Sequence, residues 1–384
     1  MKKLCYLGYY DVSENRDEMR SCPLAAVNKM TYICSAINRA GYDVEIVSAS
    51  RTAGKQDCPG HLIRVSENTS LRLFPCKGTG SVWKRGVRAI EMQWRIFQYL
   101  WKNIQSGDVL LAYHSLGYVR TLWLLKKLKR FRLILEVEEI YSDVTGDERV
   151  RKLEMRLFKA ADAYLFPTEL LDEKINTERK PAVVVYGTYQ VEEERNCSWG
   201  DGKRHLLYAG TLDPRKGGAA AATAAAGELS EGYHVHILGF GSEQEKKDLC
   251  ETITKINMTA KAGVSYDGVL GGEEYIRFVQ SCDVGFSTQM PDAAFNETSF
   301  PSKVLSYLAN GLRVVSIRIK ALERSAVSDL LYYYDENTPE AVAETVQKID
   351  FSQPYDSRAV IRQLDAKFVK EFKRLIEEGA FNGK

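Results

Sequence analysis

Short apolar runs rich in β-branched and aromatic residues alternate with helix-length amphipathic segments along most of the chain. This alternation is typical of βαβ units, in which a helix connects neighbouring strands of a parallel sheet. In the first half, the predicted strands are residues 3–8, 43–49, 108–113, 132–138, 163–168 and 182–187. Six such strands make one complete α/β domain.

The pattern breaks at residues 188–203, which are polar, contain glycine and have no periodicity, as a linker would. The alternation then resumes and predicts a second α/β domain. Its predicted strands are residues 204–210, 234–241, 262–268, 283–288 and 312–317. Residues 355–378 have apolar positions at helical spacing with no strand after them, which predicts a terminal helix.

Composition narrows the class of protein. The chain has 384 residues, of which 45% are hydrophobic and 27% charged, so we expect about two soluble globular domains. A net charge of +2 argues against nucleic acid as a main partner. The N-terminal apolar run is too short for a signal peptide or a membrane span. The eight cysteines are scattered without a C-x-x-C pair, so we expect reduced thiols in a cytoplasmic protein.

Residues 208–218, "YAGTLDPRKGG", join a strand that ends at Gly210 to a helix through a turn with two adjacent cations, Arg215 and Lys216. Glycines allow a close approach of the backbone, and a helix N-terminus presents unpaired N–H groups. Together with the cations these features suit a bound diphosphate. A solvated basic turn explains the same residues equally well.

Residues 295–311, "FNETSFPSKVLSYLANG", carry a second candidate for phosphate binding. Pro301 suits a first helical turn, Ser302 and the free N–H groups can bind an anion, and Lys303 can neutralise it. A helix with a favourable start is the alternative.

A third stretch, "LGFGSEQE" at residues 238–245, is a strand-turn-helix with Gly239 and Gly241. It lacks the G-x-G-x-x-G fingerprint, and none follows the first strand, which argues against a dinucleotide-dependent dehydrogenase.

The order of these three stretches resembles the C-terminal, donor-binding half of retaining GT-B glycosyltransferases, particularly the family 4 group of bacterial polysaccharide enzymes. The resemblance is strong over residues 204–318 and weak over the first half. It implies an α/β fold of two Rossmann-like domains whose parallel sheets face each other across a cleft. Residues 1–190 would form the acceptor domain and 204–350 the donor domain, with the helix of 355–384 packing back on the first.

The resemblance also implies an activity. A sugar would move, with retention, from a nucleotide-diphosphate sugar to a glycan or lipid-linked acceptor in cell-surface polysaccharide biosynthesis. This is a hexosyltransferase-type reaction that requires no metal and no cofactor.

In the family, the lysine that contacts the diphosphate corresponds to Lys216. Thr211 stands where an arginine is common, which leaves Arg215 as a substitute. The two glutamates of the family's Glu-x7-Glu pattern are replaced by Thr298 and Ser306, and Glu297 is the neighbouring carboxylate. The resulting donor-binding prediction comprises Gly210, Thr211, Arg215, Gly239, Gly241, Thr298, Ser299, Phe300, Pro301, Ser302, Lys303 and Ser306. The catalytic prediction comprises His114, Lys216 and Glu297.

On the acceptor side, His114 follows a predicted strand, where family members often carry a histidine near the reacting sugar. A loop histidine with local hydrogen bonds is the alternative. Glu138 and Glu139 also follow a strand and either orient an acceptor hydroxyl or form a salt-bridged loop. The first loop is expected to border the cleft through Gly8, Tyr9, Tyr10 and Asp11.

Three further features of the sequence allow more than one interpretation. His234 and His236 alternate along a strand, but the sequence offers no third ligand, so we expect a buried strand and no metal. Residues 83–102 and 120–132 are basic and aromatic, as in helices that rest on the anionic inner face of a membrane, or in core helices with a solvated face. A nucleotide-sugar epimerase remains as a rival, because it uses the same two-domain fold on a similar ligand, although it needs carboxylates in the cleft that can abstract protons. A non-catalytic partner subunit is the second rival, because Thr298 and Ser306 replace the two glutamates.

Overall fold

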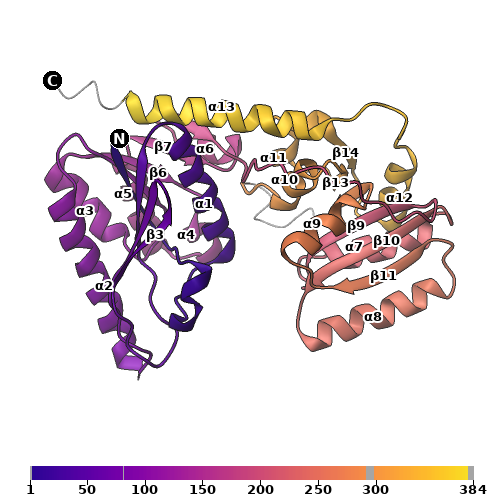
Figure 1. The fold of residues 1–384 in the computed structure, drawn as a ribbon, viewed down its shortest axis with the longest axis horizontal. Coiled ribbons are helices and arrows are strands. Elements are labelled where there is room, and N and C mark those ends of the chain that lie inside the picture. Colours follow the sequence, from indigo (N-terminus) through magenta and orange to yellow (C-terminus); the bar gives the residue numbers. More distant parts are fainter. Residues whose placement is uncertain (1, 81, 291–297, 379–384) are drawn as a thin grey trace. The chain divides into compact units, whose positions relative to one another are not determined.

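The computed structural model describes residues 2–80, 82–290 and 298–378. The chain divides into two compact units. The first unit comprises Met1–Thr188 and Ala366–Lys384, and the second comprises Tyr189–Asp365. Each unit has a β-sheet with helices packed against it (Figure 1).

The sheet of the first unit has the strand order β3-β4-β2-β1-β5-β6-β7-β8. Neighbouring strands are parallel except for the antiparallel pair β3–β4. The strands are β1 (Lys3–Gly8), β2 (Asp43–Ser48), β3 (His61–Ser66), β4 (Thr69–Leu73), β5 (Val109–Tyr113), β6 (Arg132–Glu136), β7 (Ala163–Phe166) and β8 (Ala182–Val184). Six of them match the predicted runs. The hairpin β3–β4 was not predicted, because its first strand alternates between partly and fully exposed residues and offers no apolar run.

The first sheet is covered by helices that follow its strands. They are η1 (Ser13–Glu18), α1 (Leu24–Arg39), α2 (Val82–Asn103), α3 (Val119–Lys129), α4 (Tyr141–Thr145), α5 (Glu148–Ala160) and α6 (Glu169–Ile175). Central strand residues such as Leu111 and Ile134 are fully buried, as expected for parallel strands covered on both faces.

The sheet of the second unit has the order β11-β10-β9-β12-β13-β14, and every pair in it is parallel. Its strands are β9 (Arg204–Thr211), β10 (Tyr233–Phe240), β11 (Gly263–Gly268), β12 (Val284–Ser287), β13 (Arg313–Ile317) and β14 (Leu331–Tyr334). Its helices are α7 (Gly218–Ala225), η2 (Ala226–Glu228), α8 (Glu243–Asn257), α9 (Gly272–Gln280), α10 (Ser302–Ala309), α11 (Lys320–Glu323), η4 (Ser328–Leu330) and α12 (Pro339–Gln347). The edge strand β14 was not predicted.

Two segments connect the units in sequence. Residues 188–203 contain no helix or strand, and within the second unit Arg195 forms an ion pair with Glu273 of α9 at 2.7 Å. The terminal helix α13 (Ser357–Glu377) begins in the second unit and continues into the first. Within the first unit, Phe368 of α13 stacks on Tyr32 of α1 with ring centroids 5.7 Å apart.

Tyr307 fixes helix α10 against the sheet of the second unit. Its ring lies against Gly285 of β12, where a Cβ atom would stand 2.3 Å from the ring. The pairing of β9 with β12 ends at Leu207 and Gly285, and beyond that point the Tyr307 hydroxyl accepts the N–H of Ala209 at 2.8 Å. The hydroxyl thus replaces a strand partner for the last part of β9.

Replacing Tyr307 with phenylalanine should leave the partly buried N–H of Ala209 without its acceptor. We expect Tyr307→Phe to lower the free energy of unfolding by about 1 kcal/mol, the lower end of the cost of an unsatisfied donor, because water can reach part of this residue. Urea denaturation of the purified variant measures this loss. The matched control is Tyr233→Phe, because the Tyr233 hydroxyl makes no hydrogen bond to any residue that the structure describes. Equal stability of the two variants would refute the role assigned to Tyr307.

Candidate functional site

The first unit contains a pocket of about 670 Å³ at the edge where its parallel strands end. Its lining residues follow four neighbouring strands: Tyr9 follows β1, Arg51 and Thr52 follow β2, Ser115 follows β5 and Tyr141 follows β6. We call this cavity the first-unit pocket. It lies at the point where the strand order reverses between β1 and β5, which is where open α/β sheets usually bind ligands.

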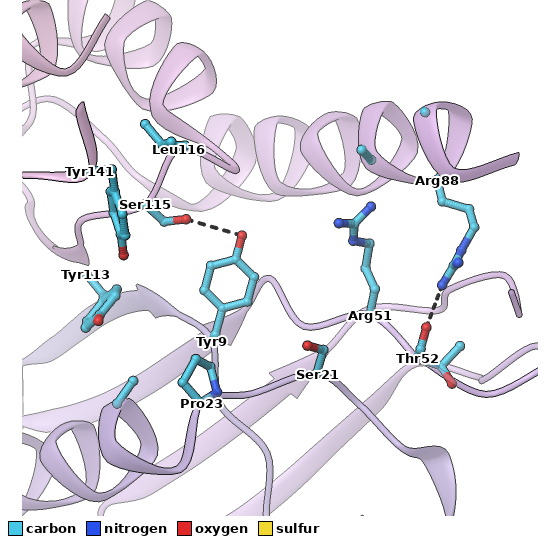
Figure 2. Close-up of a pocket in the computed structure, with 13 residues that line it drawn as sticks. Tyr9, Ser21, Pro23, Arg51, Thr52, Arg88, Tyr113, Ser115, Leu116 and Tyr141 are labelled. Atoms are coloured by element: carbon cyan, nitrogen blue, oxygen red, sulfur yellow. Dashed lines mark hydrogen bonds between the residues drawn. The ribbon is translucent and has the colours of Figure 1, made fainter. Parts of the chain in front are cut away.

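One end of the first-unit pocket is rich in tyrosine hydroxyls (Figure 2). Ser115 donates a hydrogen bond to the Tyr9 hydroxyl at 3.4 Å, and Tyr9 stacks on Tyr118 with centroids 5.7 Å apart. Burial raises the pKa of Tyr113 well above its usual range and that of Tyr141 to about 12, so both hydroxyls keep their protons at neutral pH. Aromatic rings that carry hydroxyl donors suit a ligand with both apolar and hydroxylated faces, such as a sugar.

The other end of the first-unit pocket is cationic. Arg51 and Arg88 lie to one side of Tyr9 in Figure 2, and Tyr113 and Tyr141 lie to the other. Arg88 extends from helix α2 and donates from Nη2 to the carbonyl oxygen of Thr52 at 2.5 Å. The predicted acceptor set did not include either arginine.

Of the residues predicted for the first loop, Tyr9 lines the first-unit pocket, whereas the other three have local partners. Gly8 lies against Met30, and a Cβ atom there would stand 2.5 Å from Met30 Cε. Tyr10 is buried, with its hydroxyl 3.0 Å from Thr31 Oγ1. Asp11 accepts hydrogen bonds from Asn15 at 3.1 Å, and burial raises its pKa.

The carboxylates predicted at the end of β6 are not among the residues that line the first-unit pocket. Glu138 forms an ion pair with the buried ammonium of Lys29 at 2.5 Å. Of the two alternatives predicted for Glu138, the structure therefore matches the salt-bridged loop. Glu139 follows it and is exposed.

His114 is 1% exposed and turns into the interior of the first unit. Its ring centroid lies 5.1 Å from that of Tyr141 and 4.9 Å from that of Phe158, and its Nε2 atom lies 3.5 Å from Oε1 of Glu154. Burial lowers the pKa of His114 to about 4, so the ring is neutral at pH 7. Its sequence neighbours Tyr113 and Ser115 line the first-unit pocket instead.

In the second unit, the two predicted phosphate-binding stretches come together at the ends of β9 and β12. The Lys303 ammonium of α10 lies over the Tyr208 ring, 4.0 Å from its centroid. A Cβ atom on Gly210 would stand 3.3 Å from Lys303 Nζ, so the glycine leaves the ammonium room beside the strand end. Lys303 forms no ion pair with a described residue, and burial lowers its pKa to about 7.

The turn after β9 is held by its own hydrogen bonds. Thr211 accepts the N–H of Asp213 at 3.2 Å, and Asp213 forms an ion pair with Arg215 at 2.7 Å. This pairing holds the pKa of Asp213 at about 2 and engages the Arg215 guanidinium. The backbone carbonyl of Lys216 accepts the N–H of Met290 at 3.3 Å, which ties the turn to the segment after β12. The side chain of Lys216 is exposed.

The glycines of the second unit allow a close approach of strands β9 and β10. A Cβ atom on Gly239 would stand 1.9 Å from the carbonyl oxygen of Gly210, its partner in the ladder. Gly241 begins the turn into α8, where Ser242 and Glu245 form a reciprocal cap.

The remaining predicted donor residues lead into helix α10. Pro301 is its N-cap, and Ser302, which is exposed, is its first residue. Ser306 is partly buried in the same helix, and its backbone oxygen accepts a hydrogen bond from the Asn310 side chain at 2.9 Å. Thr298, Ser299 and the buried Phe300 precede the cap, whereas Glu297 lies outside the described residues.

A histidine cluster lies at the opposite edge of the second sheet, where β9 and β10 begin. His205 Nδ1 lies 2.9 Å from His236 Nε2, and each ring has a carboxylate partner at 3.0 Å, Asp201 for His205 and Asp267 for His236. His205 was not predicted to lie near His234 and His236, and β9 brings it beside the strand that carries them. No group of three or more ligands in the described part of the chain is arranged to hold a metal ion.

No family model matches this chain, and no curated protein matches it by sequence. Solved structures do resemble it. An E. coli trehalose-6-phosphate structure bound with UDP-2-fluoro glucose has a TM-score of 0.69 at 12% identity, with 99% of each chain covered. Sucrose-phosphate synthase from Thermosynechococcus elongatus has a TM-score of 0.64 at 13% identity, covering 98% of this chain and 99% of that one. α,α-Trehalose 6-phosphate synthase from Burkholderia multivorans has a TM-score of 0.63 at 10% identity, covering 99% and 96%.

The chain has the GT-B fold. The fold class predicted from the sequence is therefore confirmed. At 10–13% identity the likeness concerns the fold alone, and these neighbours do not single out family 4. In the GT-B fold of this chain, the candidate acceptor residues lie at the strand ends of the first sheet and the candidate donor residues at those of the second.

The burial of His114 predicts a pH dependence of stability. Its pKa in the folded chain, about 4, lies below the ordinary value of 6.5, so the unfolded chain takes up a proton between these values and the folded chain does not. The free energy of unfolding should therefore decrease as the pH is lowered. This one group accounts for a loss of about 2 kcal/mol between about pH 7 and about pH 5.

Urea denaturation at both pH values tests this on the wild-type chain and on His114→Phe, which keeps a ring among Tyr141 and Phe158. The variant should lose about 2 kcal/mol less. Between about pH 7 and about pH 8 the two proteins should change in parallel. If the wild-type chain and His114→Phe also lose the same free energy of unfolding between about pH 7 and about pH 5, the result would contradict the burial of a neutral His114 ring.

Proposed function

We propose that this chain is a glycosyltransferase that moves a sugar from a nucleotide-diphosphate sugar to an acceptor. The donor would bind where β9 and β12 end in the second unit, and the acceptor in the first-unit pocket. One observation carries the proposal: the Lys303 ammonium lies beside Gly210 without a carboxylate partner among the described residues. A structural neighbour bound with UDP-2-fluoro glucose supports the choice of donor.

Loss of the diphosphate leaving group is the difficult step of such a transfer. Lys303 and the N–H groups at the start of α10 would stabilise the negative charge that develops on the leaving oxygen. We assign a supporting role to Lys216, whose turn is bonded to the segment after β12. Protein cations and backbone dipoles supply this stabilisation, so we propose a reaction that needs no metal ion and no cofactor.

The finer assignments extend the resemblance of the three donor motifs to family 4. We propose a retaining hexosyltransferase of polysaccharide biosynthesis, with a glycan or a lipid-linked acceptor. Arg215 has no direct role in this proposal because Asp213 engages its guanidinium. His114 has none either, because it is buried away from the first-unit pocket.

We also propose that the protein is cytoplasmic and binds peripherally to the inner face of a membrane. Helices α2 and α3 pack together and expose Trp94, Trp101 and Leu128. Lys127 lies 4.1 Å from the Trp123 ring centroid, and Lys129 lies 4.9 Å from that of Trp101. Tryptophan and lysine together suit the interface of an anionic bilayer. None of the described helices is long and apolar enough to cross a membrane.

The pKa of Lys303 predicts how nucleotide binding depends on pH. In the free chain this pKa is about 7, so above that pH the amine is largely neutral and must take up a proton to bind a diphosphate. We expect the affinity for UDP, GDP or ADP, whichever binds, to fall by about tenfold between about pH 7 and about pH 8.5. Isothermal titration measures this.

Lys303→Arg should bind with an affinity nearly independent of pH over that range, because arginine keeps its proton. Lys303→Met should weaken binding at the lower pH by about tenfold or more. Lys261→Met, which removes an exposed lysine of the second unit, is the control. If no nucleotide binds the wild-type chain, the proposed function fails. Nucleotide binding without hydrolysis or transfer would instead indicate a non-catalytic subunit, the rival suggested by Thr298 and Ser306 in place of the family's two glutamates.

The membrane proposal is tested by co-sedimentation with vesicles. The chain should bind vesicles of phosphatidylcholine with phosphatidylglycerol and should bind pure phosphatidylcholine weakly. Lys127→Glu combined with Lys129→Glu should lower binding to the anionic vesicles by about tenfold or more, since each cation near such a surface contributes about 1 kcal/mol. The control reverses two exposed lysines of α8, Lys247 and Lys255. Equal loss in both double variants would count against an α2–α3 contact.

A further inference from the structure

The first-unit pocket has an unbalanced charge. Among the residues that the structure describes, its lining includes Arg51 and Arg88 and no acidic residue. Arg51 is partly exposed, and its side chain forms no ion pair or hydrogen bond with a described residue. Arg88 is 9% exposed, and its buried Nε atom makes no hydrogen bond within the described chain. A buried cation is costly unless it is paired, so these two guanidinium groups suit a ligand that carries negative charge.

The protein itself fixes the loop backbone that carries Arg51 and the side chain of Arg88. Buried Arg20 donates to the carbonyl oxygens of Ser50 at 3.3 Å and Pro59 at 3.0 Å, which holds the loop that carries Arg51. The Arg51 carbonyl also accepts the N–H of Ser21 at 2.9 Å. Arg88 is tied to the same loop through Thr52. Because the protein orders this loop and Arg88 by itself, a ligand would not bear the entropy of ordering them.

Arg20 provides an internal comparison for the two pocket arginines. It is as buried as Arg88, but its guanidinium has a carboxylate partner, Glu18, at 2.5 Å. Within the described part of the chain, the arginine that supports the loop has an acidic partner, and the two arginines that face the cavity have none.

The pocket has room for a charged group together with a sugar ring. Its volume of about 670 Å³ lies within the usual range for small-molecule sites, about 300–1,000 Å³. The hydroxyls of Tyr113 and Tyr141 lie on the side of Tyr9 that is opposite to the arginines (Figure 2). A sugar phosphate would offer hydroxyls to one end and an anion to the other.

We propose that the first-unit pocket binds an acceptor whose sugar lies among the tyrosines and whose phosphate or diphosphate is bound by Arg51 and Arg88. Arginine suits this role because its planar guanidinium binds phosphate oxygens through two parallel hydrogen bonds. That the ligand is an acceptor rests on the proposed function, whereas the binding of the anion does not. The same chemistry is found in a free sugar phosphate and in a lipid-linked sugar, whose diphosphate is attached at C1.

Isothermal titration of the full chain carrying Lys303→Met tests the proposal, since this variant weakens the candidate donor site. The probes are inorganic pyrophosphate, glucose 6-phosphate, glucose 1-phosphate and methyl glucoside. We expect at least one phosphorylated probe to bind about tenfold or more tightly than methyl glucoside. A preference for glucose 1-phosphate points to a lipid-linked acceptor, and a preference for glucose 6-phosphate points to a free sugar phosphate.

Adding Arg51→Met to this background should weaken binding of the phosphorylated probe by about tenfold to a hundredfold and leave methyl glucoside unchanged. Arg88→Met should do the same. Arg95→Met is the matched control, because Arg95 lies on the same helix and pairs with Glu91 at 2.6 Å. If Arg88→Met unfolds the chain, as circular dichroism would show, the partly exposed Arg51 still decides the test.

The proposal is overturned if no phosphorylated probe binds, or if Arg51→Met binds it as tightly as the Arg95→Met control does. Nucleotide titration of the wild-type chain separates this failure from that of the proposed function. Nucleotide binding without anion binding in the first-unit pocket would refute the acceptor class alone. Anion binding without nucleotide binding would refute glycosyl transfer alone.

Discussion

Parallel pairing brings the carboxyl ends of neighbouring strands to one edge of each sheet, and both candidate sites depend on this constraint. In the first unit it gathers Tyr9, Arg51, Ser115 and Tyr141 around one cavity, although more than a hundred residues separate the first from the last. In the second unit it sets the turn after β9 beside the segment that leads into α10. Side chains from distant parts of the chain therefore meet at the strand ends.

The cationic side chains fall into two groups, those with a carboxylate partner and those without one among the described residues. The first group has a structural role, and the second is available to a ligand. Arg20, Lys29 and Arg215 each have a carboxylate within 2.7 Å, and each stabilises a local loop or turn. Lys303, Arg51 and Arg88 have no such partner in the described part of the chain. Because an unpaired cation in a partly dry site costs free energy, its persistence is a physical reason to expect an anionic ligand.

The sequence predicted most strands and the donor motifs, because these follow from apolar periodicity and from glycines and cations close together in sequence. Arg51 and Arg88 were missed, since one follows a strand in a loop without a motif and the other lies on a helix that looked like a surface helix. His114 was chosen for its place after β5. Burial depends on how α4 and α5 cover that strand end, which the sequence does not reveal, and it is the flanking Tyr113 and Ser115 that reach the cavity.

Helix α13 has a consequence for the order in which the chain folds during synthesis. Phe368 and Phe372 are 2% and 0% exposed and belong to the first unit, whose only segment after residue 188 is Ala366–Lys384. A ribosome therefore makes the whole second unit before it supplies these aromatic rings. Until then the surface around Tyr32 stays open to water, so the first unit completes its packing only after the second unit has been synthesised.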